Sequence, residues 1–414
     1  MTPSSDLKIG FARLSDAASV IVAKTRQEFD KQGLKVDLIR YDSWAAMRDA
    51  LAHGVIDAAH ILAPIVVASA AGLGPYPGRF KTSFSINLNG NAITFSNVLI
   101  EQLRTQAPET LLQRPFLPTA LKTVIESRRK SGDDPLTFAH VYHYSMHGYE
   151  LRYWLSAAGI DPSHDIKIVA IPPERMVESL ASGVIDGFCV GEPWNSVAQD
   201  ADIGQTVITS SEVWSNSPEK VLAVRQDWSD ENPDIHHALI KAMLLASKWL
   251  DTPENRITAA RIISQPDYLD VPDYMLLRSL AGKSVVTGGN LVSDLPDFNI
   301  LHRYAANFPW RSHAMWILSQ MQRWGEASPD LNIASCAAKA YDTDLYRKAA
   351  TAVGVAYPTI DEKTEGLHSH AWLLEDASSP IAMGPDQFLD GRSFTPIEQT
   401  QARAGREIQP ALEK

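Results

Sequence analysis

Short apolar runs alternate with amphipathic stretches in the first half of the chain, and this order occurs twice. The first copy contains Gly54-Val-Ile-Asp57, and the identical Gly183-Val-Ile-Asp186 follows 129 residues later. In each copy a β-type run and an amphipathic stretch precede the Gly, and a short apolar run follows it. A Gly just beyond an amphipathic stretch is typical of a helix end, and such apolar runs are typical of buried parallel strands. The pattern predicts two similar α/β lobes rather than a solenoid.

The remaining pattern places the boundaries of these lobes. Strands are expected at 7–12 and 136–142, and an Asn-Gly turn within 85–96 predicts a strand pair around it. Beyond Asp227 the amphipathic stretches predict a mainly helical C-terminal extension, with loop-rich structure after 355. We therefore expect residues 1–98 plus 222–414 in lobe I, 99–221 in lobe II, and a ligand cleft between the lobes.

Composition and charge narrow the class of protein. The 414 residues are 45% hydrophobic with a mean hydropathy of −0.15, as in soluble globular chains. A net charge of −11 argues against direct nucleic-acid binding, which needs clustered Lys and Arg. No apolar segment approaches the ~18 residues that span a bilayer. The start of the chain has neither the basic nor the apolar part of an export signal, so we expect a cytoplasmic protein.

Known catalytic and metal-binding motifs are absent from the sequence. It contains no nucleophile elbow, phosphate loop, His-Glu-x-x-His or Cys-x-x-Cys. Its two cysteines, Cys189 and Cys336, support neither a disulfide framework nor a cysteine metal site. Asp57 and Asp186 occupy equivalent repeat positions, which favours a structural role. We therefore expect no enzyme activity, cofactor or metal.

Several polar residues stand where a ligand in the cleft could reach them. Ser145 and His147 lie at a predicted helix start, where free backbone N–H groups favour an anion, although both also suit helix capping. Trp44 begins a helix at the cleft mouth and could pack there or contact a ligand. Glu192 could bind a cation or pair with Arg or Lys. Lys220 lies in the segment returning between the lobes, where one positive charge would suit a small anion, although a lone Lys is usually solvated.

Taken together, these stretches resemble the nitrate- and bicarbonate-binding proteins of bacterial ABC transporters, and more closely their cytosolic relatives, the nitrate/nitrite sensors of the NasS type. The matching stretches are Ser43-Trp44, Ile56-Asp-Ala-Ala-His-Ile-Leu-Ala-Pro64, Asn87-Leu-Asn-Gly-Asn-Ala-Ile93, His147-Gly-Tyr-Glu-Leu-Arg-Tyr-Trp-Leu155, Gly187-Phe-Cys-Val-Gly-Glu-Pro-Trp-Asn195, Pro218-Glu-Lys-Val-Leu222, Phe308-Pro-Trp-Arg-Ser-His313 and Phe388-Leu-Asp-Gly-Arg392. The resemblance implies a two-lobed periplasmic-binding-protein fold of the second type.

The resemblance also implies a set of ligand positions. In the nitrate-binding members the anion contacts residues that match Trp44, Asn91, His147 and Lys220. The transporter proteins carry Gln in place of Asn91, whose side chain is one methylene shorter. Bicarbonate binders carry Glu in place of Lys220, so a Lys here indicates nitrate or nitrite. Secondary candidates in or beside the matched stretches are His60, Gly90, Ser145 and Glu192.

The similarity to the sensors implies a protein partner. This partner is an antiterminator of the NasT type with an RNA-binding ANTAR domain, held inactive by the ligand-free sensor and released when nitrate or nitrite binds. Two alternatives stay open. One is the substrate-binding component of a nitrate or bicarbonate transporter, and the other is an enzyme on the same fold, such as a pyrimidine-precursor synthase. The latter would need a catalytic His or a Cys-rich set, which the sequence does not show.

Overall fold

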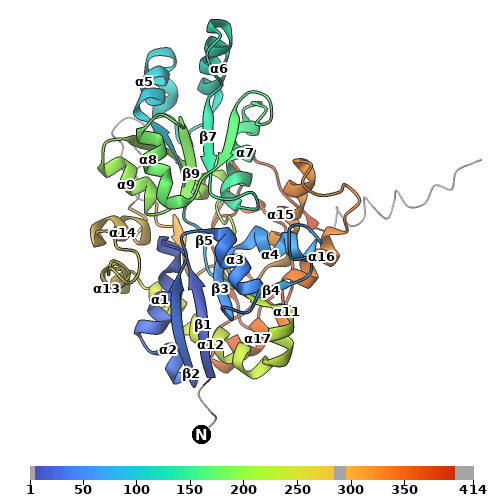
Figure 1. The fold of residues 1–414 in the computed structure, drawn as a ribbon. Helices are drawn as coiled ribbons and strands as arrows, with labels where there is room; N and C mark the ends of the chain where they lie inside the picture. Colours follow the sequence, from blue (N-terminus) through green and yellow to red (C-terminus); the bar gives the residue numbers. More distant parts are fainter. Residues whose placement is uncertain (1–4, 284–294, 397–414) are drawn as a thin grey trace, which may run out of the picture.

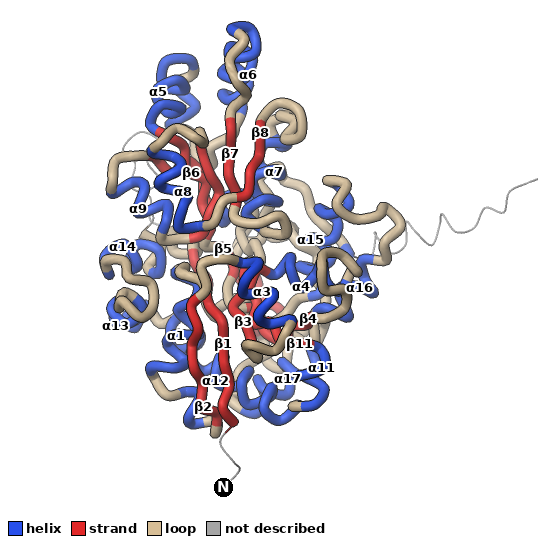
Figure 2. Tube along the Cα trace, viewed as in Figure 1, coloured by secondary structure: helices blue, strands red, loops and turns tan. Residues whose placement is uncertain are grey.

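The computed structural model describes residues 5–283 and 295–396 (Figure 1). Residues 1–4 lie outside the described residues. They belong to the N-terminal stretch on which the expectation of no export signal rests. The chain forms two lobes, each built on a five-stranded sheet, with strand orders β2-β1-β3-β11-β4 and β10-β6-β9-β7-β8 (Figure 2). The strands of lobe I are β1 (Ser5–Phe11), β2 (Leu34–Arg40), β3 (Ala58–Leu62), β4 (Phe80–Ser85) and β11 (Lys220–Arg225). Those of lobe II are β6 (Asn91–Ser96), β7 (Thr137–His140), β8 (Lys167–Ala170), β9 (Gly187–Gly191) and β10 (Gly204–Thr209).

The sequence repeat corresponds to the same unit in each sheet. β1 pairs in parallel with β2 and β3, and β7 pairs in parallel with β8 and β9. The Asp57 carboxylate accepts the N–H of Lys8 at 2.8 Å, and the Asp186 carboxylate accepts that of Thr137 at 2.7 Å. Asp57 thus ties the start of β3 to the middle of β1, and Asp186 ties the start of β9 to the start of β7, which is the structural role that the repeat predicted.

The predicted strand pair within 85–96 is wrong. β5 (Leu88–Asn89) pairs with β12 (Asn299–Ile300), whereas β6 joins the sheet of lobe II. Asn89 and Gly90 have φ of 62° and 95°, so the turn is real, but it carries the chain from one lobe to the other. Lobe II therefore begins before β6 and not after residue 98. The hydrophobic pattern predicted the strands, but it could not predict their partners.

Helices cover both sheets (Figure 1). Lobe I carries α1 (Ala18–Thr25), α2 (Glu28–Lys31), α3 (Trp44–Ala52), α4 (Ala63–Ala70), α11 (Gln226–Glu231), α12 (Pro233–Leu250), α13 (Pro253–Ile263) and α17 (Thr343–Ala352). Lobe II carries α5 (Asn97–Gln106), α6 (Thr119–Ser131), α7 (Met146–Ala157), α8 (Met176–Ala181), α9 (Trp194–Asp200) and α10 (Ser210–Val213). α14 (Asp273–Leu280) and α15 (Arg311–Arg323) each contact both lobes, and α16 (Ile333–Ala340) packs on α15 and α4. Within the described residues, no helix is both long and apolar enough to cross a bilayer.

The C-terminal extension contacts both lobes, which differs from the prediction that all of 222–414 belongs to lobe I. The Tyr149 hydroxyl on α7 donates to Glu326 at 2.7 Å, and the Tyr153 hydroxyl donates to Asp390 at 2.8 Å. The ring of Trp214 stacks on that of Phe388 with centroids 4.6 Å apart. Burial of aromatic rings drives this contact, because the apolar surface of lobe II beside α7 would otherwise face water.

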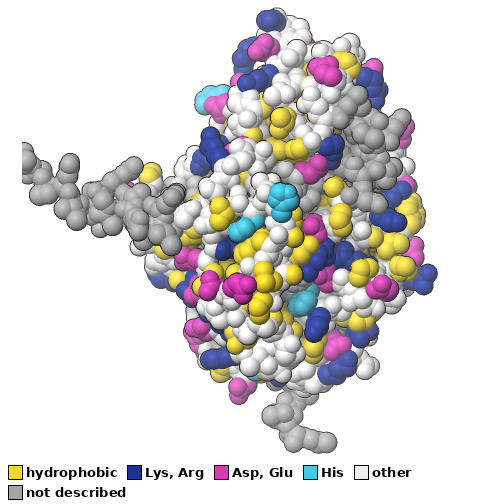
Figure 3. Space-filling view, turned by 180° about the vertical axis from the view of Figure 1, so that it is seen from behind, with side chains coloured by type: hydrophobic (Ala, Val, Ile, Leu, Met, Phe, Trp, Pro, Cys, Tyr) yellow, Lys and Arg dark blue, Asp and Glu magenta, His cyan; other side chains and the backbone are white. Residues whose placement is uncertain are grey.

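Charged side chains of both signs are interspersed over the face shown in Figure 3. Nucleic-acid-binding surfaces gather Lys and Arg along one stripe. The described part of this face shows no such stripe, in keeping with the acidic charge of the chain.

Candidate functional site

A buried lysine lies where the two lobes meet. Lys220 begins β11, has no exposed surface, and places its Nζ 3.0 Å from Asp16 Oδ2. The same ammonium group also pairs with the adjacent Glu219. Burial alone would lower the pKa of Lys220, but Asp16 and Glu219 raise it above its ordinary value. The lysine therefore carries its charge in a dry environment.

A network of hydrogen bonds surrounds this ion pair and joins the lobes. His60 Nε2 on β3 lies 2.8 Å from Asp16 Oδ1. Asn91 Nδ2 on β6 donates to Glu219 Oε2 at 2.9 Å and to Glu150 Oε2 at 3.0 Å. We call this group the Lys220 cluster; it comprises Asp16, His60, Asn91, Glu150, Ser217, Glu219 and Lys220. None of its members exposes more than 4% of its surface.

Two aromatic side chains beside the cluster keep unused hydrogen-bonding groups. The indole N–H of Trp44 and both ring nitrogens of His147 are buried without a hydrogen-bond partner. Lys220 Nζ lies 5.5 Å from the centroid of the Trp44 ring, and His147 Nδ1 lies 3.6 Å from Glu219 Oε1. Buried donors without partners are costly and uncommon in folded proteins. Their position next to a buried ammonium group therefore points to a small polar ligand.

The acidic groups of the cluster differ in charge. Burial raises the pKa of Asp16, but Lys220 and His60 outweigh it and leave that pKa below its ordinary value. Burial, and then Glu219, raise the pKa of Glu150 to about 8. Burial also raises the pKa of Glu219, against the attraction of Lys220. At neutral pH, Asp16 is ionised and Glu150 holds a proton.

The predicted positions Trp44, His60, Asn91, His147 and Lys220 come together here, whereas other secondary candidates do not. The Ser145 hydroxyl caps α7 by accepting the N–H of Gly148 at 3.2 Å. The Glu192 carboxylate accepts the N–H of Ser196 at 3.1 Å, and the Gly90 carbonyl accepts the N–H of Glu192 at 3.3 Å. These groups serve local backbone structure.

Three acidic members of the cluster, Asp16, Glu150 and Glu219, were not predicted from the sequence. Glu219 directly precedes Lys220, and Glu150 follows His147 by three residues, which places both side chains on one face of α7. Asp16 lies in the short 3-10 helix Ser15–Ala17 that follows β1. The spacing of Glu150 from His147 was the available signal.

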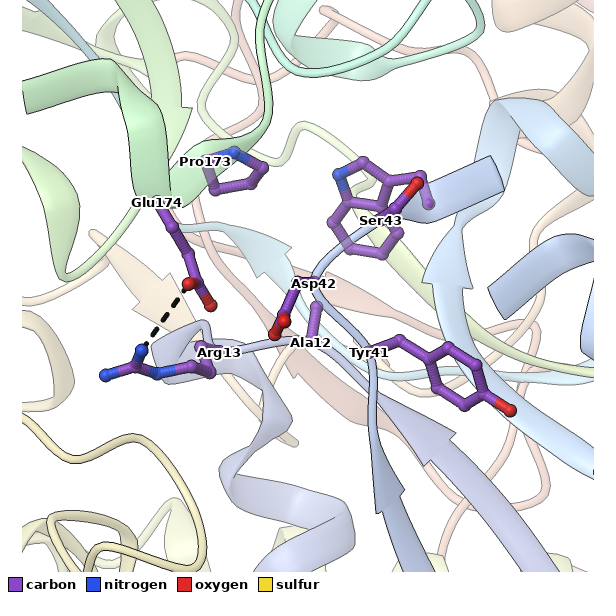
Figure 4. Close-up of a pocket in the computed structure, with 8 residues that line it drawn as sticks. Ala12, Arg13, Tyr41, Asp42, Ser43, Pro173 and Glu174 are labelled. Atoms are coloured by element: carbon purple, nitrogen blue, oxygen red, sulfur yellow. Dashed lines mark ion pairs between the residues drawn. The ribbon is translucent and has the colours of Figure 1, made fainter. Parts of the chain in front are cut away.

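A small pocket opens next to Trp44 at the mouth of the cleft (Figure 4). Arg13 Nη1 of lobe I lies 3.5 Å from Glu174 Oε2 of lobe II across this pocket. One helical turn after Trp44 on α3, Arg48 donates to the hydroxyl of Tyr142 of lobe II. These contacts hold the lobes together over the Lys220 cluster. Ala12, Arg13, Tyr41, Asp42, Ser43, Trp44, Pro173 and Glu174 line the pocket.

Comparison with known proteins identifies the family. Residues 1–264 match the NMT1-like family. The chain belongs to this family. The nitrate/nitrite binding protein NrtA of Synechococcus elongatus is 32% identical over 399 residues, covering 94% of this chain and 86% of that protein. The nitrate import ATP-binding protein NrtC of Synechocystis is 33% identical over 375 residues, and the matched part is 52% of its length.

Solved structures support the same assignment. The crystal structure of the periplasmic nitrate-binding protein NrtA from Synechocystis matches with a TM-score of 0.82 and 26% identity, covering 96% of this chain and 97% of that one. The chain thus has the two-lobed periplasmic-binding-protein fold that the repeat and the resemblance predicted. No group of three or more His, Cys, Asp and Glu among the described residues is arranged to hold a metal ion.

Proposed function

We propose that this member of the NMT1-like family binds nitrate or nitrite at the Lys220 cluster. The observation that carries the proposal is the fully buried Lys220 ammonium beside the unpartnered indole of Trp44 and imidazole of His147. The similarity to NrtA, which is named as a nitrate/nitrite binding protein, supports it. NrtA is a binding protein, which fits a binding role without catalysis.

The chemistry of the cluster suits such an anion. Nitrate is planar, weakly basic and singly charged, so it needs one positive charge and a few N–H donors. Lys220 supplies the charge, and Trp44 and neutral His147 supply donors. Burial, followed by the nearby Lys220, lowers the pKa of His147 well below its ordinary value, so this histidine donates without adding charge. A charge-assisted hydrogen bond gains strength in a site without water.

The role of this binding depends on the partner. The resemblance to the NasS-type sensors favours a cytoplasmic sensor that holds an antiterminator of the NasT type and releases it when the anion binds. The names of NrtA and NrtC favour instead the substrate-binding component of a nitrate transporter. Both proposals place the same anion in the same cleft, and they differ in what the closed lobes contact.

Titration calorimetry with nitrate, nitrite and bicarbonate tests the binding itself. We expect heat from nitrate or nitrite and none from bicarbonate, because Lys220 offers a positive charge where bicarbonate binders carry Glu. Binding of bicarbonate alone would contradict the proposal.

A capture experiment separates the two roles. An antiterminator retained without nitrate and released with it would support the sensor. Capture of no antiterminator, together with nitrate-dependent association with transporter membrane subunits, would support the transport component. The His147→Ala variant should respond at higher nitrate concentrations than the original protein.

A further inference from the structure

Carboxyl groups outnumber positive charges in the Lys220 cluster. Asp16, Glu150 and Glu219 surround the single ammonium of Lys220, and all are buried. The amide nitrogen of Asn91 donates to one oxygen of Glu150 at 3.0 Å and to one of Glu219 at 2.9 Å. Two carboxyl groups held by one donor in a dry site resist simultaneous ionisation. A bound monoanion would add a further negative charge.

We propose that Glu150 holds a proton that anion binding requires, so that nitrate binds only while Glu150 is protonated. This inference rests on the proposed function. Glu150 lies one helical turn from His147 and within reach of Asn91, close to where the anion would lie. When protonated it is neutral, and the remaining charges of Asp16 and Glu219 are opposed by Lys220. When ionised it would place a second uncompensated charge beside the ligand.

The surroundings of Glu150 can accommodate the proton. One carboxyl oxygen lies 2.6 Å from the Ser217 hydroxyl, which can rotate to accept a hydrogen bond from the protonated carboxyl group instead of donating one. The other carboxyl oxygen faces the amide of Asn91. Because Glu150 is 2% exposed, water contributes little to stabilising its ionised form.

The other titratable groups packed around Glu150 are His147, Cys189, Asp16, Glu219 and Lys220. Burial lowers the pKa of His147 on α7 and raises that of Cys189 on β9, so both stay neutral around pH 8. Asp16 and Lys220 stay charged, because Lys220 lowers the pKa of Asp16 and Asp16 raises the pKa of Lys220. Glu219 is the competing proton acceptor, and its contact with Lys220 opposes protonation. Burial and Glu219 raise the pKa of Glu150 to about 8, within the range that an experiment can reach.

The test is the affinity for sodium nitrate between about pH 6.5 and 9.5, measured by calorimetry on the original chain and on Glu150→Gln. We expect constant affinity at low pH and a loss of about tenfold per pH unit once Glu150 ionises. Glu150→Gln mimics the protonated group, so it should bind within about threefold of the original chain at low pH and lose the steep pH dependence.

Glu192→Gln is the matched control. Glu192 is also a buried carboxyl group, and burial raises its pKa to about 7, but its oxygen accepts the N–H of Ser196 outside the cluster. This variant should keep the pH profile of the original chain. A profile flattened by Glu192→Gln and not by Glu150→Gln would overturn the assignment.

The remaining outcomes distinguish the two proposals. If the original chain binds nitrate at no pH, the proposed function fails. If it binds equally at every pH, only the role of Glu150 fails. Should Glu150→Gln not fold, calorimetry of the original chain near pH 9 in two buffers with different ionisation enthalpies supplies the answer. Uptake of about one proton with nitrate supports the inference, and no uptake overturns it.

Discussion

Two buried lysines in this molecule have similar partners but different surroundings. Lys363 Nζ in the C-terminal extension lies 3.0 Å from Asp386 Oδ2 and pairs also with Glu365, as Lys220 pairs with Asp16 and Glu219. Each lysine thus bridges two buried carboxylates. We call the second group the Lys363 cluster; it comprises Ser312, His313, Lys363, Glu365 and Asp386.

The tryptophan beside the Lys363 cluster is hydrogen-bonded within it, whereas the tryptophan beside the Lys220 cluster is not. Trp214 donates its indole N–H to Asp386 at 2.8 Å, whereas the indole N–H of Trp44 has no partner. Burial raises the pKa of Glu365, but Lys363 outweighs it and lowers that pKa to about 2. In the Lys220 cluster the pKa of Glu219 remains raised. A buried lysine alone therefore does not distinguish the proposed site from the Lys363 cluster; the unpartnered indole of Trp44 and the third carboxyl group, Glu150, do.

The histidines do not separate the two clusters. His313 Nε2 lies 3.5 Å from Glu365 Oε2, and its two ring nitrogens, like those of His147, are buried without a hydrogen-bond partner. The contrast rests on the tryptophans and on the third carboxyl group, and the following substitutions act on these differences.

The largest effect is expected from removing either lysine. Lys220→Met and Lys363→Met each leave two buried carboxylates without their cation, at a cost of about 3–5 kcal/mol in the free energy of unfolding. Only Lys220→Met should also lose nitrate binding. Denaturant titration measures the first quantity and calorimetry the second. Loss of nitrate binding by folded Lys363→Met would abolish the contrast.

The next effect is a pH dependence of stability with opposite signs. The pKa of Glu365 is lowered, so its contribution is complete above about pH 4.5 and is lost as the pH falls towards 2. The pKa of Glu150 is raised, so stability falls by about 1.4 kcal/mol per pH unit between about pH 4.5 and 8.

These signs predict opposite behaviour of the two Gln variants. Glu365→Gln should melt below the original chain at pH 7, and this deficit should shrink in acid. Glu150→Gln should melt above the original chain at pH 8, with the gain shrinking towards pH 5. Thermal melts of both variants between about pH 3 and 8 provide the measurement, because the Glu365 contribution changes only below about pH 4.5 and that of Glu150 above it. Equal and parallel shifts would show that the two carboxyl groups have the same environment.

The smallest effect is expected from the tryptophans. Trp214→Phe removes the buried indole donor to Asp386 Oδ1, although Lys363 remains on Oδ2, and should cost about 1–3 kcal/mol of stability. Trp44→Phe removes an indole N–H that has no partner, so stability should change less. Nitrate affinity should instead fall about tenfold, the equivalent of about 1.4 kcal/mol. Trp214→Phe binding nitrate more weakly than Trp44→Phe would reverse the assignment.

The sequence predicted the fold better than the connections within it. The repeated Gly-Val-Ile-Asp unit predicted two lobes because hydrophobic periodicity and glycine stops are local signals. The partner of each strand is not local. β6 therefore appeared to pair with the preceding segment, although it pairs with β9 and β10 in the other lobe.

The same distinction holds for the candidate site. Residue type and position left Trp44, His147 and Lys220 open between structural roles and ligand contact, and the family resemblance implied them, with Asn91, as ligand positions. Asp16 and Glu150 resembled ordinary surface acids, because only tertiary structure shows that they are buried. The hydrogen bond from Asn91 to Glu219 joins residues that are 128 positions apart, a separation at which no sequence pattern predicts contact.

The contact between the C-terminal extension and lobe II has a consequence for cooperativity. Trp214 and Phe388 belong to one apolar core that also contains residues of the first sheet, such as Ile61. Neither lobe can lose its packing without exposing apolar surface of the other. Calorimetric melting should therefore show one transition with equal van't Hoff and calorimetric enthalpies, in place of separate lobe transitions. An anion held by a few atoms between the lobes would then delay the unfolding of the whole chain.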